Sequence, residues 1–155
     1  MTSLSANESM LYVGGNFTTL GEGGSLVDRP YFGAINLSNG QIDNLSLNVD
    51  TNFQPITAVT ATNSSIYLGG NFSGVNGVPR HRVAAISTTT GEVTDWKLQS
   101  IQYIYAGNSW INTIAAYHDG VFIGGGFDRI TTFWHIMSCM MGSGKVACAF
   151  VKLCF

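Results

Sequence analysis

The feature that most constrains the fold is a segment of 20 residues that recurs three times without a gap. Its copies occupy residues 1–20, 56–75 and 111–130, at an offset of 55 both times. The apolar and glycine positions recur together: Leu4, Val59 and Ile114; Val13, Leu68 and Ile123; and the Gly-Gly pairs that begin at Gly14, Gly69 and Gly124. A register kept twice indicates a chain built from repeating structural units.

A second part of the unit repeats at an offset of 51. Residues 32–37 correspond to 83–88, and residues 39–43 correspond to 90–94. The offset is smaller because the loop after Phe17 is four residues longer than the loop after Phe72. Length variation confined to a loop is typical of a strand scaffold, because loops tolerate insertions that strands do not.

The second copy reads as four strands separated by turn formers. We expect strands over 56–62, 65–72, 82–88 and 93–99, with a turn at Asn63-Ser64 and another at Thr90-Gly91. Four short antiparallel strands in about 45 to 55 residues are typical of a β-propeller blade. The predicted fold class is therefore all-β, with about two and a half four-stranded blades in an open, incomplete propeller. A β-sandwich or solenoid is the alternative.

The composition agrees with strands and turns and excludes several classes of protein. Charged residues make up only 10% of the chain, against about 25% in a typical soluble domain, and there are 19 glycines. The net charge of −2 provides no basic surface for nucleic acid. No stretch reaches the roughly 18 apolar residues of a membrane helix, and the first residues lack the pattern of a signal peptide.

Several of these residues resemble a known repeat. The segments Tyr-Leu-Gly-Gly-Asn-Phe at 67–72 and Val-Asn-Gly-Val-Pro-Arg at 75–80, with Ala84-Ala85, Thr90-Gly91 and Trp96, are similar to the delta-60 type β-propeller repeat. The first copy departs from it, with Leu45 at the tryptophan position. The resemblance covers residues 1 to about 132 and implies propeller blades in a secreted or cell-surface protein. Similar repeats occur in fungal cortical proteins that mark growth sites.

The domain organisation follows from where the repeat ends. We predict blades at about 1–50 and 51–105 and a partial blade at 106–132, followed by a non-repeat tail at 133–155. The tail holds all three cysteines and no Asp or Glu, and we predict that it is irregular. An abrupt change in composition suggests a departure from the parent reading frame or splicing; a genuine capping segment is the alternative.

The sequence offers no pattern that predicts a catalytic, cofactor-binding or metal site. Gly142–Lys145 lacks the flanking residues of a phosphate loop, and the Asn48-x-Asp50-x-Asn52 pattern lacks the glycine and glutamate of a calcium loop. We interpret the latter as a polar connection between blades. The histidines and cysteines have no metal spacing: His81, His118 and His135; Cys139, Cys148 and Cys154. We expect His118 to be an exposed turn residue.

Arg29 and Arg80 occupy corresponding places after the long loop of their units. An anion-binding role is one interpretation. A repeated structural role, with hydrogen bonds to loop carbonyls, is the preferred one, because a ligand-binding residue does not have to recur in every blade. The chain also contains six N-glycosylation sequons, more than chance predicts, at Asn7, Asn16, Asn36, Asn44, Asn63 and Asn71. Together with the low charge, they favour an extracellular or cell-surface location.

Three functions fit these observations. The first is a non-catalytic fragment of a secreted or cell-surface propeller that serves as a binding or structural scaffold, with a protein or glycan as its ligand. The second is a fragment of a propeller enzyme, such as a quinoprotein-type dehydrogenase or a lyase. The third is a truncated gene product with no independent function. In each case an open set of blades leaves apolar faces exposed, so self-association through these faces is expected.

Overall fold

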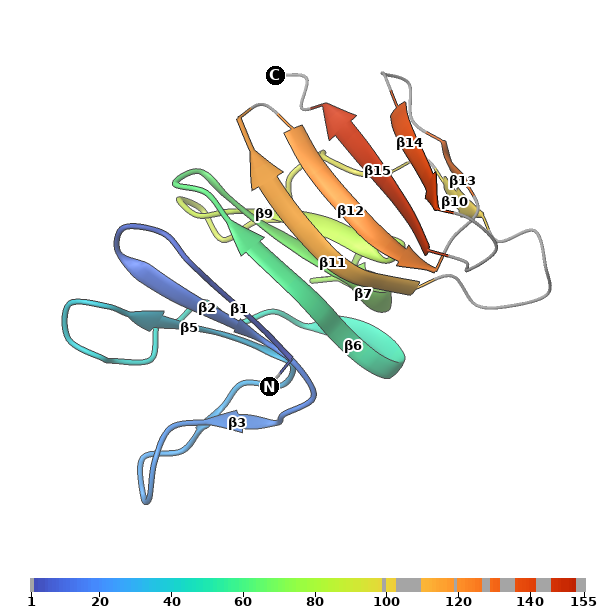
Figure 1. The fold of residues 1–155 in the computed structure, drawn as a ribbon. Helices are drawn as coiled ribbons and strands as arrows, with labels where there is room; N and C mark the ends of the chain where they lie inside the picture. Colours follow the sequence, from blue (N-terminus) through green and yellow to red (C-terminus); the bar gives the residue numbers. More distant parts are fainter. Residues whose placement is uncertain are drawn as a thin grey trace.

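The computed structural model describes residues 2–98, 100–102, 110–118, 120–126, 129–131, 136–141 and 146–152. Throughout these residues the regular structure is β-strand, which confirms the all-β prediction. Within the same residues, no helix is long and apolar enough to cross a membrane. Three antiparallel sheets are stacked one on the next in an open arrangement, and none of them closes on itself (Figure 1).

The first sheet has the order β1-β2-β5, with all neighbours antiparallel. Strand β1 spans Ser3–Ala6, β2 spans Met10–Gly14 and β5 spans Phe32–Asn36. The long loop between β2 and β5 carries a small hairpin of β3 (Thr19–Leu20) and β4 (Val27–Asp28). The insertion in this unit therefore lies in a hairpin outside the main sheet.

The second sheet is the same arrangement built from the next repeat. Its strands are β6 (Val49–Ala61), β7 (Ser65–Val75) and β9 (Val83–Ser87), with β7 in the centre, and β8 (Val78–Pro79) pairs with the end of β7. Strand β6 begins before the predicted start at residue 56, because Val49 and Asp50 already pair with the end of β7. The predicted turn at Asn63-Ser64 is confirmed, since β6 ends at Ala61 and β7 begins at Ser65.

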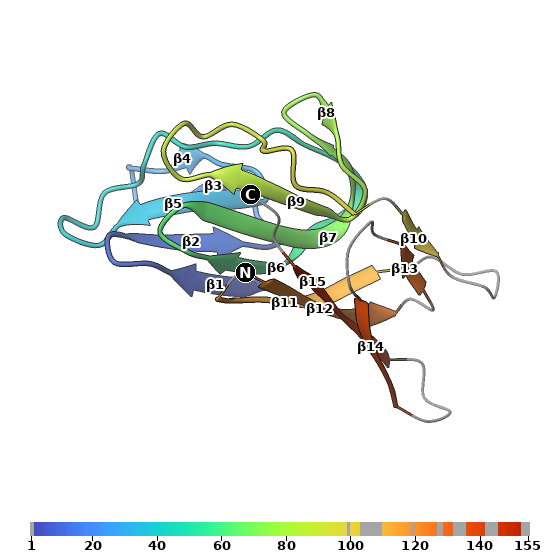
Figure 2. The same cartoon turned by 90° about the horizontal axis from the view of Figure 1, so that it is seen from above.

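The third sheet has the order β11-β12-β15-β14 and lies on the other side of the second sheet from the first (Figure 1; seen from above in Figure 2). Strands β11 (Trp110–Tyr117) and β12 (Gly120–Gly126) come from the third copy of the repeat. Strands β14 (Ile136–Met141) and β15 (Val146–Lys152) come from the tail. Strands β10 (Ser100–Gln102) and β13 (Arg129–Thr131) form a separate pair.

The predicted irregular tail is therefore wrong for its described residues. Strand β15 pairs with β12 along six positions and β14 pairs with β15, so the tail covers the edge of β12. The physical reason lies in the composition: two apolar runs rich in residues that suit strands flank the turn formers Gly142-Ser143-Gly144. The order also differs from sequential blade order, because the later strand of the tail lies next to β12.

The repeat register predicted from sequence is confirmed by the strand pairing. Leu4 pairs with Val13, Val59 with Leu68, and Ile114 with Ile123, each pair displaced from the last by 55 residues. Turn bonds repeat as well: the Gly15 amide donates to the Tyr31 carbonyl at 3.0 Å, and the Gly70 amide donates to the Arg82 carbonyl at 2.9 Å. Asn16 and Asn71 follow these two glycines, so they occupy equivalent positions of the repeat, although β7 continues beyond Asn71.

The predicted fourth strand of each unit is wrong within the described residues. In its place the first two units have one isolated bridge each, between Ile35 and Ile42 and between Ile86 and Val93. Just beyond each bridge, a side-chain oxygen accepts a hydrogen bond from a backbone amide that could otherwise donate to a neighbouring strand. The Asp43 carboxylate accepts a hydrogen bond from the Leu45 amide at 2.8 Å, and the Thr94 hydroxyl accepts one from the Trp96 amide at 3.3 Å. Local bonds of this kind turn the chain away from a ladder.

Each sheet has two faces, which we call face A and face B. Directly paired residues point to the same side of a sheet, so Leu4, Leu11 and Val13 lie on face A of the first sheet, and Ser3, Ser5 and Tyr12 lie on face B. One apolar core forms between face B of the first sheet and face A of the second; it includes Tyr12, Phe32, Val59, Leu68 and Ile86. A second core lies between face B of the second sheet and face A of the third; it includes Ala58, Tyr67, Ile114 and Ile123.

The Gly-Gly pair is explained by this stacking. A Cβ atom placed on Gly14 would lie 2.6 Å from Ile56 Cγ2, and one placed on Gly69 would lie 2.5 Å from Ile111 Cγ2. Ile56 and Ile111 are themselves equivalent in the repeat, and each belongs to the next unit along the chain. The first glycine of the first two pairs thus gives the next sheet room to approach closely.

Candidate functional site

The structure places most of the predicted polar candidates in structural roles. Asn48 exchanges hydrogen bonds with Asn76: its amide donates to the Asn76 side chain at 2.8 Å, and its carbonyl accepts from the Asn76 amide at 2.7 Å. Asp50 lies in β6 beside Gly74.

His81 and His118 are exposed, and His118 lies in the turn between β11 and β12, as predicted. His135, Cys154 and the segment 142–145 lie outside the described residues. Backbone pairing sets Cys139 opposite Cys148.

Across the described part of the chain, no group of three or more His, Cys, Asp or Glu residues could hold a metal ion. Burial raises the pKa of Tyr12 and of Tyr67 above the ordinary value for a phenol, and burial lowers the pKa of Arg82. Desolvation is the first cause of each shift, and for the two tyrosines it comes from packing between sheets.

Arg29 and Arg80 have the repeated structural role that the sequence predicted. Arg29 donates to the carbonyls of Asp28 and Asp43 at 2.9 and 3.0 Å. Arg80 donates to the carbonyls of Pro79 and Thr94 at 2.8 and 2.7 Å. Every partner in the second unit is the equivalent of a partner in the first, at an offset of 51. Each guanidinium therefore ties the loop that precedes it to the segment that follows the isolated bridge.

A polar seam between neighbouring sheets is a feature that sequence reasoning missed. The Val59 amide donates to the Ser3 hydroxyl at 2.9 Å, and the Ala61 amide donates to the Ser5 hydroxyl at 2.9 Å. Between the second and third sheets, the Thr57 hydroxyl donates to the Ile111 carbonyl. The signal was present in the sequence, because hydroxyl residues alternate with apolar ones along the first strand of the unit. This alternation did not show that the hydrogen-bond partners of the hydroxyls are backbone groups of the next unit.

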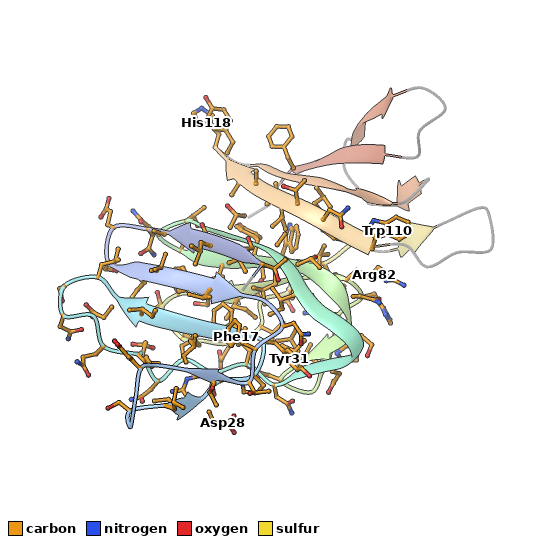
Figure 3. The ribbon with its side chains drawn as sticks, turned by 60° about the horizontal axis from the view of Figure 1, so that its bottom comes forward. Phe17, Asp28, Tyr31, Arg82, Trp110 and His118 are labelled. Atoms are coloured by element: carbon orange, nitrogen blue, oxygen red, sulfur yellow. The ribbon has the colours of Figure 1, made fainter. Side chains whose placement is uncertain are left out.

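One end of the stacked sheets collects aromatic and amide side chains from all three units. Figure 3 shows Phe17, Tyr31, Arg82 and Trp110 at this end, which we call the loop end, and His118 at the opposite end of the third sheet. Tyr31 and Arg82 are equivalent in the repeat and share a left-handed backbone, with φ of 69° and 67°. Arg82 donates to the Asn71 side chain at 2.6 Å. This surface has the residue types that bind polar and aromatic ligands, and it also includes the longer loop of the first unit.

The six sequons differ in how their asparagine side chains are engaged. Asn16, Asn44 and Asn63 are exposed. The Asn7 amide group donates to the Thr62 carbonyl at 3.3 Å, and its oxygen accepts from the Met10 amide at 2.9 Å. The side-chain oxygen of Asn36 accepts from Ser38, and that of Asn71 accepts from Arg82. Only an asparagine with an exposed, uncommitted amide group can carry a glycan without loss of structure.

We therefore predict that the folded product of a secretory host carries glycans at Asn16, Asn44 or Asn63 and none at Asn7. Glycosidase digestion should lower the mass of the secreted protein, and Asn63→Gln should remove part of that mass difference. Asn7→Gln is the matched control, and it should leave the glycan mass unchanged. A protein that showed no mass shift on digestion would contradict both the use of these sequons and the secreted interpretation.

Comparison of the sequence with protein-family models and with curated proteins finds no match.

Proposed function

We propose that this chain is a non-catalytic part of a secreted or cell-surface β-propeller and serves as a structural and ligand-binding scaffold. The observation that carries the proposal is the sheet-on-sheet interface, which is made twice with the same positions of the repeat. Tyr12 and Tyr67 are both buried on face B, and Val59 and Ile114 are both buried on face A. A fold in which each unit packs only on its neighbours is extendable, which is the organisation of blades in a propeller.

The secreted location and the absence of catalysis are supported by separate observations. Exposed sequons and a charged fraction of only 10% suit a protein that glycans keep soluble. Arg29 and Arg80 already bind loop carbonyls, which leaves them poor candidates for anion chemistry. The loop end is our choice for a protein or glycan ligand, because the units differ most in length there and loops carry most binding functions.

Unit duplication tests the scaffold proposal. A second copy of residues 56–110, inserted directly after Trp110, preserves the 55-residue register of the repeat. We expect the longer chain to fold with one more stacked sheet, because the inserted unit presents a face A and a face B that match its neighbours. Circular dichroism should show more strand signal, and the midpoint of urea unfolding should not fall.

The matched control is a flexible Gly-Ser insertion of the same length at the same point, which should add no strand signal. Loss of cooperative unfolding on unit duplication would contradict the proposal, since that result is expected of a single-core β-sandwich. A sandwich has two sheets that complete each other, so an inserted unit has no face to pack on.

A further inference from the structure

We propose that face B of the third sheet binds face A of the first sheet of a second copy of this chain, head to tail. The inference extends the proposed function and rests on it, because both depend on the packing of face B of one sheet against face A of the next. The chain displays both halves of one interface at its two ends, and it already makes the same interface twice internally. The internal interfaces therefore specify the occupant: an equivalent sheet in the equivalent orientation.

Face B of the third sheet is exposed at a position that is buried in both of the first two sheets. Tyr12 and Tyr67 are 2% and 3% exposed, whereas Phe122, at the equivalent position, is 44% exposed. Thr113, Ala115 and Tyr117 lie on this same face and are also exposed. The part of this face that β11 and β12 form thus consists of uncharged residues.

Face A of the first sheet shows the complementary difference. Val59 and Ile114 are 4% and 6% exposed, and Leu4, their equivalent, is 49% exposed. Ala6 is exposed on the same face, and Leu11 and Ile35 are partly exposed. The residues of β1, β2 and β5 on face A and those of β11 and β12 on face B carry no charge, so contact between these strands would bury no unpaired charge. Among the described strands, the charged residue of face B is Lys152 of β15, which pairs with Gly120.

Polar groups of the internal seam also have counterparts on the open faces. Ser3 on face B accepts a hydrogen bond from the Val59 amide. Thr113 takes the place of Ser3 in the third unit, and Leu4 takes the place of Val59 in the first. Contact between copies would therefore bring the Thr113 hydroxyl of one copy to the Leu4 amide of the other, as a second instance of this bond; Ala58 takes the place of Ser3 in the second unit and has no hydroxyl.

A head-to-tail contact has a consequence for assembly size. Interfaces between two different surfaces of one chain form closed rings or open filaments, depending on the rotation between copies. Two chains contribute about six stacked sheets, which falls within the roughly four to eight blades of closed propellers. We infer that the closed dimer is the favoured assembly.

The test uses two charge substitutions and their mixture, followed by sedimentation velocity. Leu4→Glu blocks face A and leaves face B intact, whereas Phe122→Glu blocks face B and leaves face A intact. We expect the wild-type chain to sediment as two chains of 16.6 kDa each, and each variant to lose that species and sediment as one chain. An equimolar mixture of the two variants should recover the two-chain species, because one intact face of each kind remains.

Leu26→Glu is the matched control, since Leu26 is 58% exposed but lies outside both faces; it should assemble as the wild type does. Far-UV circular dichroism should show that all three variants remain folded. A wild-type chain that is folded and monomeric at every concentration would overturn the inference. So would variants whose mixture fails to associate, which is the result for pairing of like faces or non-specific aggregation. If the unit-duplication chain folds as expected in the same experiment, the scaffold proposal survives that outcome.

Discussion

Leu68→Ala is expected to lower the free energy of unfolding by about 2–5 kcal/mol, the range for a buried leucine truncated to alanine. Leu68 is fully buried on face A of the second sheet, in the core that this sheet shares with the first. It lies in the central strand β7, so neighbouring strands confine it within the sheet as well. The truncation leaves a cavity, and small movements of either sheet cannot fill it without loss of contacts elsewhere.

Equilibrium unfolding in urea, followed by tryptophan fluorescence and circular dichroism, measures this loss. Domains are stable by only about 5–15 kcal/mol, so the variant is expected to be close to unfolding at 37 °C. Leu26→Ala provides the control, because the same truncation at an exposed position should change stability by less than about 0.5 kcal/mol. If the two variants lost equal stability, the first two sheets would not share the core described above.

The sheets and their register could be predicted from sequence because they depend on period-two patterns that the chain repeats. Leu4, Val59 and Ile114 align in the sequence, and the structure pairs each with the expected partner. A period-two pattern predicts which residues of a strand share a face, and a sequence repeat predicts that the faces of successive sheets pack in the same way each time. Arg29 and Arg80 were predictable for the same reason, since they recur at one place in the unit.

The fourth strands and the tail could not be predicted in this way. Segments 42–45 and 93–96 have strand-like residues, but Asp43 and Thr94 bond to nearby amides, and propensity alone does not weigh that competition. The tail has no counterpart in the repeat, and its strands depend on an edge of β12 that other residues left open. Likewise, the Arg82–Asn71 bond at the loop end has no equivalent in the first unit, where Tyr31 replaces the arginine.

Arg80→Ala is the second substitution with a large expected effect. Arg80 is only 8% exposed and donates to the carbonyls of Pro79 and Thr94. Hydrogen bonds to a charged group contribute about 1.5–3 kcal/mol each, and truncation also removes a buried side chain. We expect the free energy of unfolding to fall by about 2–4 kcal/mol in urea titrations. Arg80→Lys should not restore it, because one ammonium group does not reproduce the fork that spans the two carbonyls.

The position of Thr94 explains why this arginine matters more than a loop residue usually does. The segment after Val93 is attached to β9 by a single bridge and by a backbone hydrogen bond from the Thr94 amide to the Ala85 carbonyl. The Arg80 guanidinium therefore provides part of the attachment that the hydrogen bonds of a paired fourth strand would provide. Hydrogen exchange in Arg80→Ala should therefore become faster first at the Thr94 and Trp96 amides, ahead of the β7 amides. Arg29→Ala is the matched variant: Arg29 is less buried, so we expect a smaller loss of about 1 kcal/mol. Equal losses at the two sites, or uniform exchange in Arg80→Ala, would mean that the arginines do not anchor these segments.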